Sequence, residues 1–100
     1  MEKFVKYNKL FDCYSNLLTE KERNCFKDYY GEDLSLQEIA ENNNVSRSAI
    51  HKTIKNVEEK LDEYEFNLKL CHIFDKLKEL ENLNDINKIK EEINKILENE

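Results

Sequence analysis

The side chains best suited to recognising another molecule gather in one short window, residues 46–57. Every charged residue in this window is basic, and these residues are Arg47, Lys52 and Lys55. The chain has 100 residues and a formal net charge of -6, so an acid-free stretch runs against its overall balance. The window predicts attraction to a polyanion, and nucleic acid is the polyanion that we expect. In the alternative interpretation, the basic run is only the polar side of a structural or protein-docking helix.

The side-chain types in the window suit different parts of a duplex. Arg47 can offer a fork of N–H donors to guanine, and Ser48 and His51 can donate or accept at base edges. Lysines are compact charges that suit phosphate, and a glutamine at the start of the preceding helix could also hold a phosphate. The candidate DNA-binding residues are therefore Gln37, Ser46, Arg47, Ser48, His51, Lys52 and Lys55.

Two helices must position these side chains, and the sequence marks where both begin. Ser35 and Glu38 form a capping box, a pair of side chains that satisfies unpaired N–H donors at a helix start. That helix ends in Asn42–Asn44, residues that tolerate a left-handed backbone and so permit a sharp turn. Ser46 is then a suitable N-cap for the helix that carries the basic window.

The order of helix, tight turn and helix predicts a helix-turn-helix. In such a unit the first helix crosses the DNA backbone, and the N-terminal residues of the second contact base edges in the major groove. The small side chain of Ala40 would allow the two helices to approach closely. Apolar side chains are expected to fill the space between them, namely Ile39, Ala40, Val45, Ile50 and Ile54.

Further helices are expected on the N-terminal side of this unit. Apolar residues at three- and four-residue spacing over residues 4–18 predict a first helix. A second capping box, Thr19 with Glu22, opens a helix that stops at Gly31. We expect that helix to bury Cys25, Phe26 and Tyr29.

The C-terminal part of the chain is acidic and also helical. Residues 1–57 hold nine acids and nine bases, whereas residues 58–100 hold thirteen acids and seven bases, so the whole charge of -6 lies there. An apolar seam predicts a long helix with a break near Cys71 and His72, and Asp85 is expected to cap a last helix. The apolar residues need cover, so we expect these helices to pack on the domain or to form a homodimer.

No segment alternates polar and apolar residues as a strand does, and the chain has no proline and one glycine. The sequence predicts an all-α fold, with a helix-turn-helix domain over residues 1–70 and an acidic helical extension over residues 71–100. No apolar run approaches the roughly 20 residues of a membrane span, and no secretory leader pattern is present. We therefore expect a cytoplasmic protein without a membrane span.

Catalysis, metal binding and cofactor binding are not predicted. Cys13, Cys25 and Cys71 are widely separated and in no CxxC pair, so their spacing does not indicate a zinc site. The chain has no glycine-rich phosphate loop, no HExxH motif and no nucleophile elbow. We expect a protein that is not an enzyme, with no catalytic residues, no metal ligands and no cofactor.

The segment LTEKERNCFKDYYGEDLSLQEIAENNNVSRSAIHKTIKNVEEKLDEYE resembles the fourth region of sigma factors, the part that reads promoter DNA. With LFDCYSNLLTEKER in front, the chain is more similar to the YlxM family of small bacterial proteins, over roughly residues 7–68. The resemblance implies a sigma-region-four-like fold with added C-terminal helices, and a regulatory or accessory role in the signal recognition particle pathway. Where generic helix-turn-helix units have an apolar residue and a glycine, this chain has Asn43 and Asn44, which implies a slightly altered packing angle.

Two functions fit these observations. The first is a helix-turn-helix regulatory protein that binds double-stranded DNA and takes part in the signal recognition particle pathway. The second is a protein-interaction module that binds a component of that particle and keeps the helix-turn-helix as a scaffold. The sequence does not separate duplex DNA from RNA, whereas a steep salt dependence would separate nucleic-acid binding from protein docking.

Overall fold

A computed structural model describes residues 2–99, and over this range the chain is helical with short connections and no strand. The all-α prediction is therefore confirmed. The chain divides into two compact units, Met1–Leu68 and Lys69–Glu100.

The first unit begins with helix α1, Glu2–Tyr14, followed by a short 3-10 turn, Ser15–Leu17, and helix α2, Glu20–Phe26. The start of α2 has the expected capping box, because the Thr19 hydroxyl accepts from the Glu22 N–H and the Glu22 carboxylate accepts from the Thr19 N–H. The same carboxylate also accepts from Lys60 Nζ at 2.6 Å. One acidic side chain thus both caps α2 and ties it to a distant helix.

The segment after α2 is a π-helical turn, Lys27–Gly31. A π-helix has hydrogen bonds between residues five apart, and here the Glu32 N–H donates to the Lys27 carbonyl at 2.8 Å. Because a π-helical turn contains one extra residue, the position that faces the core moves by one residue along the chain. Tyr30 is therefore buried, and Tyr29 is only half-buried. The prediction that Tyr29 is buried was therefore wrong, because it assumed a regular α-helical period.

Helices α3, Leu36–Asn43, and α4, Arg47–Leu68, form the helix-turn-helix. Ser35 and Glu38 make the predicted capping box at the start of α3. The turn passes through Asn44, whose left-handed backbone, φ 56 and ψ 42, is the conformation expected from the asparagine run. Side-chain chemistry at both helix ends therefore determines where the chain reverses.

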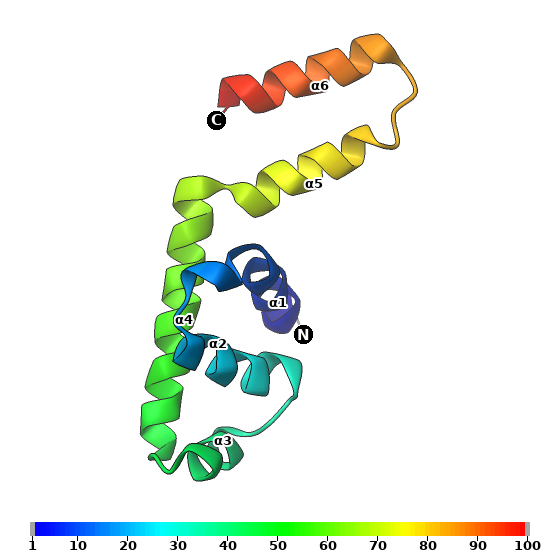
Figure 1. The fold of residues 1–100 in the computed structure, drawn as a ribbon. Coiled ribbons are helices and arrows are strands. Elements are labelled where there is room, and N and C mark those ends of the chain that lie inside the picture. Colours follow the sequence, from blue (N-terminus) through cyan, green and yellow to red (C-terminus); the bar gives the residue numbers. More distant parts are fainter. Residues whose placement is uncertain (1, 100) are drawn as a thin grey trace. The chain divides into compact units, whose positions relative to one another are not determined.

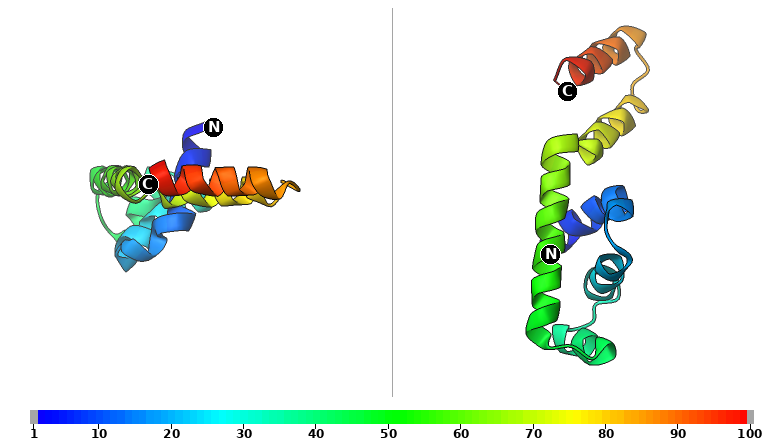
Figure 2. Two further views of the ribbon diagram at one scale, coloured as in Figure 1. Left: turned by 90° about the horizontal axis from the view of Figure 1, so that it is seen from above. Right: turned by 60° about the vertical axis from the view of Figure 1, so that its left-hand side comes forward.

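Helix α4 is the long element against which the rest of the unit packs. Helices α3, α2 and α1 contact it at successive levels along its length, as Figure 1 and the right-hand view of Figure 2 show. The contacting face of α4 is apolar, and its buried members are Ile50, Ile54, Val57 and Leu61. From the other helices come the largest buried rings, with Phe26 stacked on Tyr30 at a centroid distance of 4.4 Å. This core holds the N-terminal half of α4 in place.

The second unit consists of helices α5, Leu70–Leu80, and α6, Ile86–Asn99, which pack against each other. As predicted, Asp85 caps α6, since its carboxylate accepts from the Asn87 N–H at 2.9 Å. The predicted break near Cys71 and His72 is misplaced, because α4 already ends at Leu68 and Lys69 has a left-handed backbone with φ 55. Over the described residues, no helix combines the length and the apolar character that crossing a membrane requires.

Candidate nucleic-acid interface

The candidate interface is the N-terminal half of α4, and its start is fixed by Ser46. The Ser46 hydroxyl oxygen accepts from the Ala49 N–H at 3.1 Å, which is the N-cap contact expected from the sequence. The hydroxyls of Ser46 and Ser48 lie 3.2 Å apart. Thr53, one turn after Ala49, donates its hydroxyl to the Ala49 carbonyl at 3.1 Å. The polar groups at this helix start are therefore ordered by contacts within the helix.

The structure places every predicted site residue at the surface. Those of the second helix lie on the first turns of α4, where the chain has no acid, and they are Ser46, Arg47, Ser48, His51, Lys52 and Lys55. Gln37 lies apart from them on α3, and its amide donates to the Glu41 carboxylate at 3.1 Å. The structure therefore brings together the predicted residues of α4 and leaves Gln37 on the neighbouring helix, engaged with an acidic side chain.

Helix α4 changes charge along its length. Residues 47–57 carry Arg47, Lys52 and Lys55 without an acid, whereas the rest of the helix carries one base, Lys60, among Glu58, Glu59, Asp62, Glu63 and Glu65. Helix residues rise about 1.5 Å each, so the basic part extends along roughly the width of a major groove. A polyanion can therefore approach the N-terminal half of α4 but is repelled by the C-terminal half.

The boundary between the two halves is Glu58, a functional candidate that sequence reasoning missed. Its side chain is 6% exposed and lies 3.4 Å from Lys55 Nζ and 3.5 Å from Lys3 Nζ. The Tyr30 hydroxyl donates a hydrogen bond to the same carboxylate. Burial, followed by the hydrogen bond and the charge of Glu58, raises the pKa of Tyr30. Charge spacing links Lys55 and Glu58, but nothing in the sequence places Lys3 beside them.

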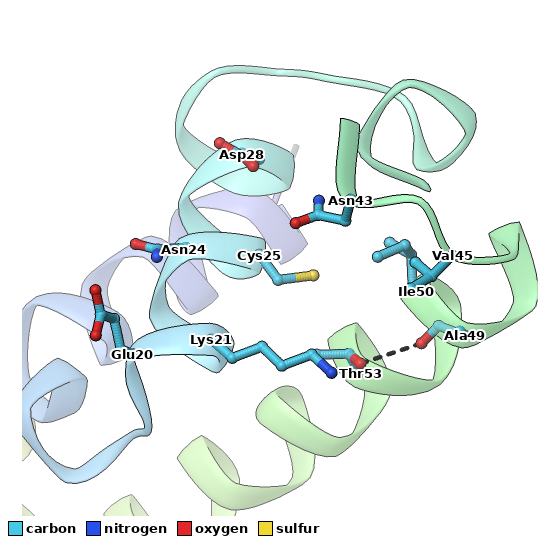
Figure 3. A pocket seen from close by; sticks show the side chains of 10 residues that line it. All are labelled: Glu20, Lys21, Asn24, Cys25, Asp28, Asn43, Val45, Ala49, Ile50 and Thr53. Carbon is cyan, nitrogen blue, oxygen red and sulfur yellow. Dashed lines mark hydrogen bonds between the residues drawn. The ribbon is translucent and has the colours of Figure 1, made fainter. Parts of the chain in front are cut away.

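A cleft of about 450 Å³ lies beside the interface, between α2 and the start of α4. Figure 3 shows its lining, in which Cys25 faces Ala49 and Ile50 across the space. Val45 also lines the cleft and is 42% exposed, so the prediction that it is buried between the two helices was wrong. The cleft is open space, so Val45 remains in contact with solvent. The other predicted members of that contact, Ile39, Ala40, Ile50 and Ile54, are buried as expected.

The cysteine in this cleft is held in its protonated form. Burial, reinforced by the nearby Asp28 carboxylate, raises the pKa of the Cys25 thiol, which keeps this sulfur protonated and weakly nucleophilic. Across residues 2–99, no group of three or more histidine, cysteine or acidic side chains is placed to hold a metal ion.

Comparisons with known proteins agree with the helix-turn-helix geometry. A family model described as "Putative helix-turn-helix protein, YlxM / p13 like" matches residues 1–100. The UPF0122 protein of Desulforamulus reducens is 51% identical over 74 residues, which are 74% of this chain. That of Malacoplasma penetrans is 51% identical over 71 residues, which are 71% of this chain. These matches cover only 63% and 66% of the two relatives, less than two thirds of their length. A UPF0122 protein of Bacillus mycoides is 42% identical over 98% of this chain and 94% of its own.

Proposed function

This chain belongs to the YlxM/p13-like family of helix-turn-helix proteins, and on that basis we propose that it is a regulatory protein that binds double-stranded DNA. The observation that carries the proposal is the exposed, acid-free N-terminal half of α4. In a helix-turn-helix this part of the second helix enters the major groove. The proposed role is binding, without a catalytic step.

The proposal assigns different tasks to the residues of α4. Arg47 lies in the first turn and would offer two N–H donors to one guanine, with Ser48 and His51 at neighbouring base edges. Lys52 and Lys55 lie further along the helix and would bind phosphates at the edge of the groove. On this assignment the lysines supply affinity for any sequence, and Arg47 supplies most of the sequence preference.

A salt titration tests the proposal. Fluorescence anisotropy of a labelled duplex is measured with the full chain at 50 and 200 mM salt. Two phosphate contacts predict a slope of about -1.8 in the logarithmic plot, or roughly tenfold weaker binding at the higher salt. Lys52→Gln should reduce the slope by about 0.9, whereas Lys95→Gln, a change of equal charge on α6, should leave it unchanged. Absence of binding at 50 mM salt contradicts the proposal.

A second candidate function is docking onto a component of the signal recognition particle. It is favoured by the charge of residues 58–100, which carry thirteen acids and seven bases, since this surface would attract a basic partner. Pull-down with purified particle components tests this candidate. Charge reversal at Arg47, Lys52 and Lys55 should leave such binding intact if the acidic helices make the contact, and should abolish it if α4 does.

We also propose that two copies associate through the C-terminal helices. The second unit leaves large apolar side chains exposed on both of its helices, namely Phe74, Leu77, Ile86, Ile93 and Leu97. A dimer would cover part of this surface and would present two copies of α4 to two half-sites. Light scattering coupled to gel filtration should give twice the 12.1 kDa mass of one chain. A Leu77→Glu variant that stays dimeric would place the contact elsewhere.

A further inference from the structure

Three lysines from two helices line one cleft on the first unit. The cleft measures about 570 Å³ and lies between α1 and α4, with Lys3 and Lys6 on one side and Lys55 on the other. The side chains of these lysines are 51%, 56% and 50% exposed, so each ammonium group can reach both the protein and solvent. Of the three, sequence reasoning assigned a binding role to Lys55 alone. The contribution of α1 appears only in the folded chain.

Lys3 and Lys55 share one buried carboxylate. Glu58 Oε2 lies 3.5 Å from Lys3 Nζ, and Glu58 Oε1 lies 3.4 Å from Lys55 Nζ. The Tyr30 hydroxyl also donates to Oε2, which fixes the carboxylate from the side of the core. An ammonium group has three N–H donors, and one contact with Glu58 leaves donors on each lysine for a further anion.

Resting on the proposed function, we propose that Lys3 of α1 and Lys55 of α4 together bind one phosphate of the DNA backbone. The interface is then wider than the helix-turn-helix, because it includes the first turn of α1. Lys55 lies eight residues after Arg47, about 12 Å along the helix axis. That distance matches the width of a major groove, so the pair lies at its edge, where the sugar-phosphate backbone runs.

The charges around the cleft limit the site to a single phosphate. Lys3 and Lys55 exceed Glu58 by one positive charge, which is available to an anion. Lys6 lies 3.1 Å from Asp62 and is balanced by it. Glu2 also lines the cleft and brings the formal charge around it to zero, so the attraction depends on direct contact between the two ammonium groups and the phosphate. A modest electrostatic gain, equivalent to one counterion released, is therefore expected from α1.

Salt titrations of the full chain with Lys3 variants test the proposal. Lys3→Gln should weaken duplex binding about tenfold at 50 mM salt and reduce the slope of the logarithmic plot by about 0.9. Lys3→Arg keeps the charge and the donors, and it should restore both quantities. Lys60→Gln is the matched control, since Lys60 is on α4 but bonds Glu22 on α2. Circular dichroism melts verify that each variant is folded.

The outcomes separate this proposal from the proposed function. If the wild-type protein binds duplex DNA and Lys3→Gln matches it in affinity and slope, the α1 contact is overturned while DNA binding stands. If Lys3→Gln and Lys60→Gln weaken binding equally, the effect is one of overall charge, and the proposal is again overturned. If the wild-type protein does not bind a duplex at 50 mM salt, the proposed function fails and this site fails with it.

Discussion

The hydroxyl of Tyr30 donates a hydrogen bond to the carboxylate of Glu58, and both residues are 5% exposed. This contact joins the π-helical turn to α4 at the point where the helix changes from basic to acidic. A buried carboxylate is costly without partners, so the tyrosine and the two lysines around it offset the loss of water. Tyr30 is thus part of the structure that holds Lys55 at the edge of the candidate interface.

Removing the Tyr30 hydroxyl should destabilise the fold. Tyr30→Phe keeps the buried ring but leaves Glu58 with one donor fewer, which is expected to lower the free energy of unfolding by about 1 to 3 kcal/mol. Urea denaturation at pH 7 measures this difference. Tyr29→Phe is the control, because Tyr29 is half-buried and its ring contacts the same cluster. Equal losses in the two variants would show that the bond to Glu58 contributes nothing specific.

The same contact predicts a loss of stability in alkali. Because the pKa of Tyr30 is raised in the folded chain, the unfolded chain loses this proton first, at about pH 10. The contribution of Tyr30 to the free energy of unfolding is therefore fully present below about pH 10. It declines as the pH rises toward the pKa that Tyr30 has in the folded chain. Urea denaturation between pH 8 and 11 should show a shallower decline for Tyr30→Phe than for the wild type. Parallel curves would contradict the assignment.

Ala40 allows α3 and α4 to pack closely, and a larger side chain should not fit. Ala40 is 1% exposed and lies beside Ile39, which is fully buried. Ala40→Leu is expected to lower the free energy of unfolding by about 1 to 3 kcal/mol through overpacking. Asn42→Leu, on the exposed side of α3, is the control and should be close to neutral. An Ala40→Leu variant as stable as the wild type would rule out the proposed close approach.

Asn44 is the residue that allows the helix-turn-helix to turn. Its φ of 56° lies in the left-handed region, where a side chain with a Cβ is disfavoured and asparagine is tolerated best after glycine. Asn44→Ala should therefore cost about 1 kcal/mol, whereas Asn44→Gly should be nearly neutral. Thermal unfolding of both variants measures the difference. If alanine and glycine were equivalent there, the left-handed turn would not be a source of strain.

The sequence predicts best those features that depend on neighbouring residues. The structure confirms both capping boxes and the caps at Ser46 and Asp85, because in each a side chain bonds to the backbone two or three residues away. It also confirms the left-handed Asn44, which depends on the backbone preference of that residue alone. The inward position of Ile50 and Ile54 on α4 is also confirmed, since a regular helical period determines which residues face inward.

The missed features depend on the folded chain as a whole. The π-helical turn after Phe26 buries Tyr30 where a regular α-helix would bury Tyr29, and the spacing of apolar residues does not indicate the added residue. Val45 is exposed beside a cleft that Cys25 and Ala49, from two different helices, also line. The burial of Glu58 requires Lys3 and Tyr30, which are 55 and 28 residues away in the chain. Periodicity cannot reveal contacts of this kind.

Replacement of Arg47 tests whether α4 reads a base. If its guanidinium contacts one guanine, Arg47→Ala should cost about 1 to 3 kcal/mol on the preferred duplex and relax the preference at one base pair. Lys52→Gln should instead weaken binding to all duplexes alike, because a phosphate contact carries no sequence information. Anisotropy titrations on the preferred duplex and on its single-position variants distinguish the two effects.

Selection from random duplexes tests most directly whether the N-terminal half of α4 binds the major groove. The full wild-type chain is incubated at 50 mM salt with a pool of random-sequence duplexes, and the bound fraction is sequenced beside that of Arg47→Ala. We expect the wild type to enrich a short motif and the variant to lose the preference at one position of that motif. Retention of no duplex by the wild type at this salt concentration would contradict the claim and leave docking onto a protein partner as the function to pursue.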